Sequence, residues 1–438
     1  MNPKSEDLHR LRRSPTASTH EIITHRALSL SSQFSLRSHQ NLFPYDRRMM
    51  EAPKPFSSVK ERNGSVFEGF NFLTSDYLGL STHPLVKQAA AAATQRLGCN
   101  SAGSAALSGM SDGSDRLACN LGRLIHLPQV ALFSSGWAAG YGTLRALVKP
   151  GDAVVMDACI SSGVRSGATA STRRILTFRH LDTDHAHRCL RHLRATQARH
   201  AVFLVTCGLF PIDGTSADLS ALHQLCLEFD ACLIVDATHD IACTGSKGAG
   251  EIEIQSLMGK VPVVIGSLSK ALASNGGFVA VEQAEVCDYI RARSPTYLFS
   301  SALSPAQVAA ASQALAIVSS PEGSARRAAL RRSVIALRAA LVQEGLEPGD
   351  GLGPIVVIPI GDESVARQTV RRCCELGVLL NLAEYPLVPR GKSKLRLQMM
   401  TGHEPSLMPE IAKKIAFAIS ESRRNESEIR SSRAFERV

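Results

Sequence analysis

The chain is poor in aromatic residues and has no long apolar run. Only 5% of its 438 residues are aromatic, and one of them is a Trp. Nucleic-acid binding by stacking needs aromatic side chains within a clustered basic stripe, whereas the basic residues behind the net charge of +10 are scattered. No run approaches the roughly 18 apolar residues of a spanning helix. We therefore expect no nucleic-acid partner and no membrane span.

The cysteines lack the spacing of a disulfide framework or a zinc site. Their number, 11, is odd, no two are spaced as CxxC, and only Cys373 and Cys374 are adjacent. Scattered cysteines of this kind are typical of a reducing compartment. The sequence thus predicts a cytoplasmic protein without a metal centre.

The first 50 residues are basic and rich in serine. They contain eight Ser and eight Lys or Arg against four acidic residues, and include Arg10-Leu11-Arg12-Arg13. Such a composition is typical of an organellar transit peptide or of a disordered basic arm. We favour a partly disordered arm over residues 1–64, and import into an organelle is the open alternative.

From Phe70 onward, short apolar runs alternate with amphipathic stretches, which indicates an α/β fold with a mostly parallel sheet. The length predicts two domains, because single cores stop growing at roughly 250 to 300 residues. We expect a large domain over 65–304, a smaller α+β domain over 305–420 and a charged tail over 421–438. Seven strands are predicted in the large domain, at 130–133, 153–156, 174–178, 201–206, 232–236, 261–266 and 277–281.

Three reactive side chains follow two of these apolar runs. Asp236 and His239 come at the end of the run that begins at Cys232, and Lys270 follows the run 261–265. The carboxyl ends of parallel strands share one edge of a sheet, where ligands bind. An amine that can bind an aldehyde and a carboxylate that can pair with a ring cation are what pyridoxal 5'-phosphate requires.

Further motifs occur in a fixed order along the chain. They are Asp76-Tyr77-Leu78-Gly79-Leu80 with His83-Pro84, Ser135-Gly136-Trp137, Phe210 to Gly214, Ser267 to Lys270, Phe299 to Ser301, and Leu395-Arg396. With them the chain resembles the α-oxoamine synthases over about residues 65–420. The resemblance implies the type I fold of pyridoxal-phosphate aminotransferases. It also implies decarboxylative condensation of an amino acid with an acyl-CoA or an acyl-carrier thioester, which gives an α-aminoketone.

The resemblance also implies a role for each matching residue. Lys270, Asp236 and His239 are the catalytic residues: Lys270 binds the cofactor aldehyde, Asp236 pairs with the ring nitrogen, and His239 lies near the phenolic oxygen. Arg396 and Ser75 hold the amino-acid carboxylate. Ser301 is contributed by a neighbouring subunit, which implies a homodimer with shared active sites. The remaining cofactor-binding positions are Ser135, Gly136, Trp137, Ser161 and Ser267.

Several positions depart from the family pattern. Ser161 stands where most members have a histidine that stacks on the cofactor ring, and Ser75 where an Asn is usual. Cys207 and Pro211 replace a Glu and a Ser. Ala106 and Leu107 occupy positions before the last glycines of a segment that touches the acyl substrate, where Arg or His is usual. Two alternatives therefore stay open: another pyridoxal-phosphate reaction, such as aldol cleavage, racemisation or transamination, and a weakly active partner subunit.

Overall fold

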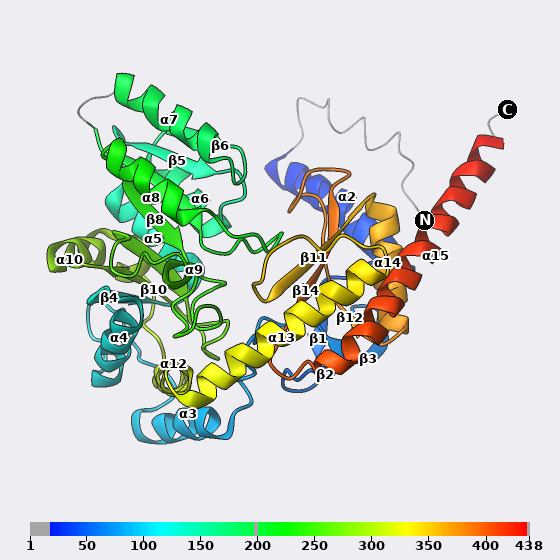
Figure 1. Cartoon of the computed structure of the whole chain (residues 1–438), viewed down its shortest axis with the longest axis horizontal. Helices are drawn as coiled ribbons and strands as arrows, with labels where there is room; N and C mark the ends of the chain where they lie inside the picture. Colours follow the sequence, from blue (N-terminus) through cyan, green and yellow to red (C-terminus); the bar gives the residue numbers. More distant parts are fainter. Residues whose placement is uncertain (1–17, 197–199, 436–438) are drawn as a thin grey trace.

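Seven strands form the central sheet, in the order β4-β10-β9-β8-β7-β5-β6 (Figure 1). β10 is antiparallel to its two neighbours, and the other pairs are parallel. The prediction of a mostly parallel seven-stranded sheet is confirmed. The strands are β4 Gln129–Phe133, β5 Ala153–Asp157, β6 Arg174–Phe178, β7 Val202–Cys207, β8 Cys232–Asp236, β9 Val263–Ser267 and β10 Gly277–Val281.

The computed structural model describes residues 18–196 and 200–435. The basic stretch Arg10-Leu11-Arg12-Arg13 lies outside these ranges. Within them, every helix is too short or too polar to cross a lipid bilayer.

Helices between the strands cover the sheet. α5 packs on β9 and β10, α7 on β5 and β6, and α8 on β8. Strands β5, β7, β9 and β10 are buried along their whole length, as expected for apolar runs that are covered on both faces. The helices of this part are α3 Pro84–Leu97, α4 Asp112–Ile125, α5 Gly136–Leu147, α6 Ser162–Ser171, α7 Thr183–Thr196, α8 Leu219–Glu228, α9 Glu251–Ile254, α10 Ala284–Arg293 and α11 Pro295–Leu298.

The C-terminal part begins with α12 and the long α13, and contains a three-stranded sheet in the order β11-β14-β13. Its last helix, α15, continues to Phe435, whereas the sequence predicted a charged tail from residue 421. The start of that stretch is held against α14, because Glu421 Oε2 accepts a hydrogen bond from Arg372 Nε at 2.7 Å and Glu426 Oε2 accepts one from Ser364 Oγ at 2.8 Å. The elements are α12 Pro305–Val318, α13 Pro321–Gln343, β11 Ile355–Gly361, α14 Glu363–Glu375, β12 Val378–Leu379, β13 Asn381–Ala383, β14 Ser393–Gln398, η2 Pro405–Leu407 and α15 Met408–Phe435.

The N-terminal segment is built into the C-terminal part. It contains α2 Thr19–His39, β1 Arg48–Met49, β2 Phe56–Lys60 and β3 Val66–Asn71, and β3 pairs in parallel with β12. The hairpin of β2 and β3 thus crosses the boundary that the sequence predicted at residues 64 and 65. Its turn contains Asn63-Gly64, a strong hairpin signal, and Gly64 has a φ of 95°.

The sheet brings the ends of distant chain segments to one edge. Asp157, Cys207, Asp236 and Ser267 are the last residues of β5, β7, β8 and β9, four strands that lie side by side and run in the same direction. Ligands of open α/β sheets bind at this carboxyl edge. The fold therefore places the predicted reactive residues where a ligand can reach them.

Gly69 permits the close contact between β3 and β12. A Cβ atom at this position would overlap the backbone carbonyl of Gly377. We expect Gly69→Ala to lower the free energy of unfolding by about 1–3 kcal/mol, the usual effect of overpacking. The control is Gly113→Ala in α4, where a Cβ would lie 3.3 Å from its nearest neighbour, Val308 Cγ1. Urea unfolding checks both, and equal midpoints for the two variants would contradict the role of Gly69.

Candidate active site

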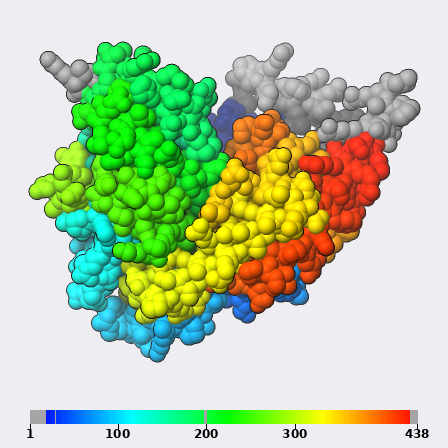
Figure 2. Space-filling model, viewed as in Figure 1, coloured from blue at the N-terminus to red at the C-terminus, as the bar shows by residue number. Residues whose placement is uncertain are grey.

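A cavity of about 960 Å³ lies at the carboxyl edge of the sheet. Its floor is formed by residues at or just after the ends of β7, β8 and β9, and its other wall by residues 386–394 of the C-terminal part. Figure 2 shows the green surface of the large domain beside the yellow and orange surface of the C-terminal part. Eight of the predicted site residues line the cavity: Ser135, Gly136, Trp137, Ser161, Asp236, His239, Ser267 and Lys270. Cys207 and Pro211, two of the departures from the family pattern, line it as well.

Lys270 lies three residues after the end of β9 and is half-buried. Burial lowers the pKa of its amine, and the charge of Arg396 lowers it further, against an opposite contribution from Asp236. A lowered pKa increases the fraction of neutral amine, the form that attacks an aldehyde. The surroundings of Lys270 therefore favour its action as a nucleophile.

Asp236 is buried and hydrogen-bonded on both carboxylate oxygens. Its Oδ1 accepts from the backbone N–H of Thr238 at 3.0 Å, and its Oδ2 accepts from Ser161 Oγ at 2.5 Å. Ser161, the N-cap of α6, thus contacts the acid that is predicted to pair with a cationic ring. The serine that cannot stack on a ring instead fixes the orientation of this carboxylate.

His239 contacts a residue for which no role is predicted from the sequence. The hydroxyl of Tyr77 lies 2.8 Å from His239 Nδ1, and the Tyr77 side chain is fully buried. Burial lowers the pKa of His239 well below its usual range, and the charges of Lys270 and Arg396 act in the same direction. Burial also raises the pKa of Tyr77. Both groups are therefore neutral near pH 7.

The N-terminus of α5 faces the cavity. Ser135 caps this helix with its side chain, and Gly136 packs so closely on Ser267 that a Cβ at residue 136 would lie 2.8 Å from Ser267 Cβ. The first amides of a helix lack intrahelical partners, and they favour an anion. Trp137, also in the cavity wall, stacks on Tyr141 with ring centroids 5.1 Å apart.

Three predicted residues lie outside this cavity. Ser75 lines a smaller cavity of about 450 Å³, which shares Lys270 with the large one, and its hydroxyl donates to Gln398 Oε1. Arg396, in β14, lines neither cavity, although its charge acts on Lys270 and His239. In the part of the chain that the structure describes, its Nε has no hydrogen-bond partner. Ser301 is exposed and forms an isolated β-bridge with Ser104.

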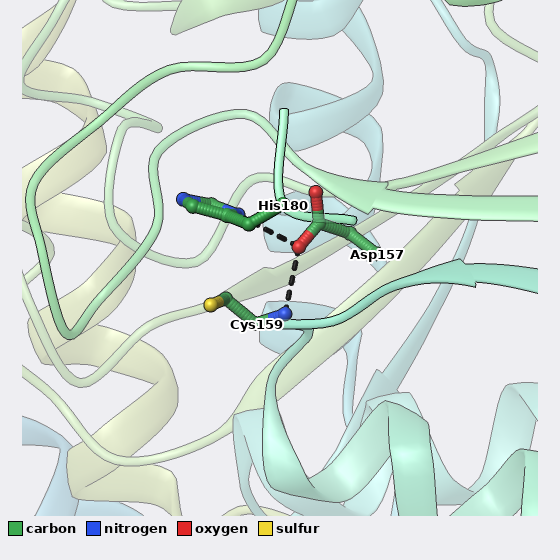
Figure 3. A group of neighbouring side chains, drawn as sticks. All are labelled: Asp157, Cys159 and His180. Carbon is green, nitrogen blue, oxygen red and sulfur yellow. Dashed lines mark hydrogen bonds and ion pairs between the residues drawn. The ribbon is translucent and has the colours of Figure 1, made fainter. Parts of the chain in front are cut away.

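A cluster of Asp157, Cys159 and His180 lies beside the cavity (Figure 3). The Nδ1 of His180 is 2.8 Å from Asp157 Oδ1, and its Nε2 is 3.0 Å from Asp213 Oδ2. Burial by itself lowers the pKa of His180, but the hydrogen bonds to the two aspartates outweigh it and raise that pKa to about 11. A metal needs the unprotonated imidazole. The cluster is therefore better described as an imidazolium held between two carboxylates.

The groups around the cavity suit pyridoxal phosphate in kind. Lys270 supplies an amine for the aldehyde, and Asp236 supplies a hydrogen-bonded carboxylate for the ring nitrogen. The start of α5, where Gly136 packs closely on Ser267, supplies a site for the phosphate. The residue types and their common cavity thus fit this cofactor.

Comparisons with known proteins agree with this fit. Residues 68–415 match the family model of aminotransferase class I and II. The chain is 32% identical to 8-amino-7-oxononanoate synthase of Trichlorobacter lovleyi over 86% of its own length and 94% of the relative. It is 29% identical to 2-amino-3-ketobutyrate coenzyme A ligase of Escherichia coli, over 86% and 93%.

Solved structures share the fold. Serine palmitoyltransferase of Sphingomonas wittichii superposes with a TM-score of 0.83 at 22% identity, over 90% of this chain and 96% of that one. For 8-amino-7-oxononanoate synthase of Francisella tularensis the TM-score is 0.67 at 21% identity, over 80% and 97%. The expected type I fold is thus confirmed. The chain belongs to the aminotransferase class I and II family, as an α-oxoamine synthase and hence a pyridoxal-phosphate-dependent acyltransferase.

Proposed function

We propose that this enzyme condenses an amino acid with an acyl thioester, with loss of CO2 and of the free thiol, to give an α-aminoketone. The proposal is carried by one observation: Lys270, Asp236 and His239 line the same cavity. The amine of Lys270 has a lowered pKa, the carboxylate of Asp236 is hydrogen-bonded, and the imidazole of His239 is neutral. When bound there, pyridoxal phosphate supplies an electron sink for the bond that breaks at the substrate α-carbon.

Lys270 has two tasks in this proposal. Its Nζ holds the cofactor aldehyde until an amino acid arrives, and the released amine then takes the proton from the substrate α-carbon. The lowered pKa of Lys270 favours both tasks, because each requires an unprotonated nitrogen. Asp236 pairs with the ring nitrogen, and the hydrogen bond from Ser161 holds its carboxylate in one orientation.

His239 donates a hydrogen bond into the cavity in this proposal. If the Tyr77 hydroxyl donates to Nδ1, the neutral imidazole carries its proton on Nε2, where it can polarise an oxygen. Tyr77 is then a positioning residue. The amino-acid carboxylate pairs with the Arg396 guanidinium, whose planar fork suits a carboxylate and whose Nε has no partner within the described ranges. Ser75 assists from the neighbouring cavity.

The phosphate is assigned to Ser135, Gly136, Trp137 and Ser267, with Ser301 supplied by a second copy of the chain. Support for a homodimer comes from two large side chains close in sequence to the Ser104 and Ser301 bridge: Leu107 is 85% exposed and Phe299 87% exposed in the single chain. Large apolar side chains that are this exposed to solvent commonly mark a protein–protein interface. A cytoplasmic location and the division between the large domain and the C-terminal domain at residue 304 stay predictions.

The condensation is tested by thiol release from acyl-CoA in the presence of single amino acids, with the aminoketone identified by mass. We expect release to require both substrates, and Lys270→Ala to lower the rate by at least about 100-fold, because it removes both nucleophile and base. Lys260→Ala, which changes an exposed lysine, is the control. Products formed from the amino acid alone would favour aldol cleavage, racemisation or transamination instead.

Ser161→Ala removes the hydrogen bond to Asp236. A hydrogen bond to a charged group is worth roughly 1.5–3 kcal/mol, so we expect the Kd for pyridoxal phosphate to rise by about 10-fold or more. Titration of the apoenzyme, followed by cofactor absorbance, measures this. Thr169→Ala, at an exposed position of α6 outside the cavity lining, should leave the Kd within about twofold. Equal values for the two variants would remove Ser161 from the site.

Tyr77→Phe keeps the buried ring and removes the hydroxyl that contacts His239 Nδ1. Because the imidazole loses its fixed orientation, we expect kcat to fall by about 10-fold while KM for the amino acid changes less than about threefold. The matched control is Tyr289→Phe, a partly exposed tyrosine of α10. A change in thermal stability without a change in kcat would make Tyr77 a packing residue only.

A further inference from the structure

One wall of the active-site cavity is aliphatic. Pro211 and Ile212 come from the loop after β7, and Leu387 and Val388 come from the loop between β13 and β14. The two loops belong to the two parts of the chain, so the wall forms only where these parts meet. The floor of the cavity, in contrast, contains the charged side chains of Lys270 and Asp236. The cavity therefore has a reactive polar face and an apolar face.

Leu387 is unusually open for a large apolar side chain. It is 60% exposed, although it lies in the cavity wall. Val388, the next residue, is 6% exposed and fixes the loop to the protein. When an apolar ligand covers such an exposed side chain, apolar surface is removed from water, and this favours binding of the ligand.

Three cations, Arg165, Lys392 and Lys394, also line the cavity. Arg165 Nη2 donates to the backbone carbonyl of Ala158 at 2.8 Å. Lys394 acts on Asp213, whose pKa its charge helps to lower, although Asp213 also pairs with His180. Lys392 is exposed. The aliphatic wall thus offers no charged partner of its own, and Lys392 remains available for an anion outside it.

Building on the proposed condensation, we propose that the acyl group transferred by this enzyme is an uncharged aliphatic chain of medium or greater length, which lies along Ile212 and Leu387. The phosphates of the thioester carrier lie toward Lys392. An acyl group that ends in a carboxylate is disfavoured along this wall, because a carboxylate placed against Ile212 and Leu387 loses water without gaining a partner among the wall side chains.

The first experiment measures binding without turnover. S-alkyl-CoA thioethers, which cannot transfer an acyl group, are titrated onto the holoenzyme with alkyl chains of 2 to 16 carbons. We expect the Kd to fall by about threefold to fourfold for each added methylene until the wall is covered. A thioether with a terminal carboxylate should bind at least about 10-fold more weakly than its methyl-terminated counterpart. Equal affinity across the series, or preference for the carboxylate, would overturn the proposal.

The second experiment changes the wall. Leu387→Glu should weaken binding of the 10-carbon thioether by at least about 10-fold and change that of the 2-carbon thioether less than about twofold. Leu227→Glu is the matched control, since Leu227 is 64% exposed on α8 and lies outside the cavity lining. A loss with both chain lengths, or the same loss in the control, would place the acyl group elsewhere.

Acyl-CoA turnover separates this inference from the function on which it rests. If no acyl-CoA of any length releases thiol with any amino acid, the condensation is wrong, whatever the thioethers do. If release occurs but its rate favours acetyl or carboxylated acyl groups, the condensation stands and the aliphatic acyl group is wrong.

Discussion

The alignment of three neighbouring parallel strands is the constraint on which the site depends. Cys207 pairs in register with Asp236, and Asp236 in turn with Ile265, two residues before Ser267. A slip of one residue would turn every side chain of a strand to the opposite face. Because β7, β8 and β9 are buried on both faces, the close packing of their side chains against the covering helices, rather than an alternation of apolar and polar residues, fixes this alignment. Core packing therefore also sets the position of the reactive groups.

Burial and two charges, one placed by β9 and the other by β14 of the C-terminal part, determine the protonation state of His239. Lys270 and Arg396 are both cations, and each lowers the pKa of His239, to which burial contributes most. Asp236 acts on Lys270 in the opposite direction. An excess of positive charge in a partly closed site favours an anionic cofactor and a substrate carboxylate. The imidazole, kept neutral by the same field, is left to act as a hydrogen-bond donor rather than as a charge.

The sequence predicted the seven strands within about two residues, because strands buried on both faces appear as continuous apolar runs. It missed the hairpin of β2 and β3, whose residues alternate in burial, even though Asn63-Gly64 marks its turn. The contact of Tyr77 with His239 and that of Ser161 with Asp236 join residues 162 and 75 positions apart. No local pattern encodes such pairs. Only the resemblance to a family located Ser161, and it gave no partner for this serine.

The N-terminal segment, expected to be a separate arm, bears on the active site through one buried acid. Glu384, at the start of the loop that carries Leu387, is 3% exposed. It forms an ion pair with Arg367 at 2.5 Å and accepts a hydrogen bond from Tyr45 at 3.1 Å, while Arg37 of α2 lies 3.9 Å away. A buried carboxylate is tolerated only when such partners are present. Two of these three partners, Arg37 and Tyr45, precede β1. The N-terminal segment therefore helps to hold the loop that forms the apolar wall of the active-site cavity.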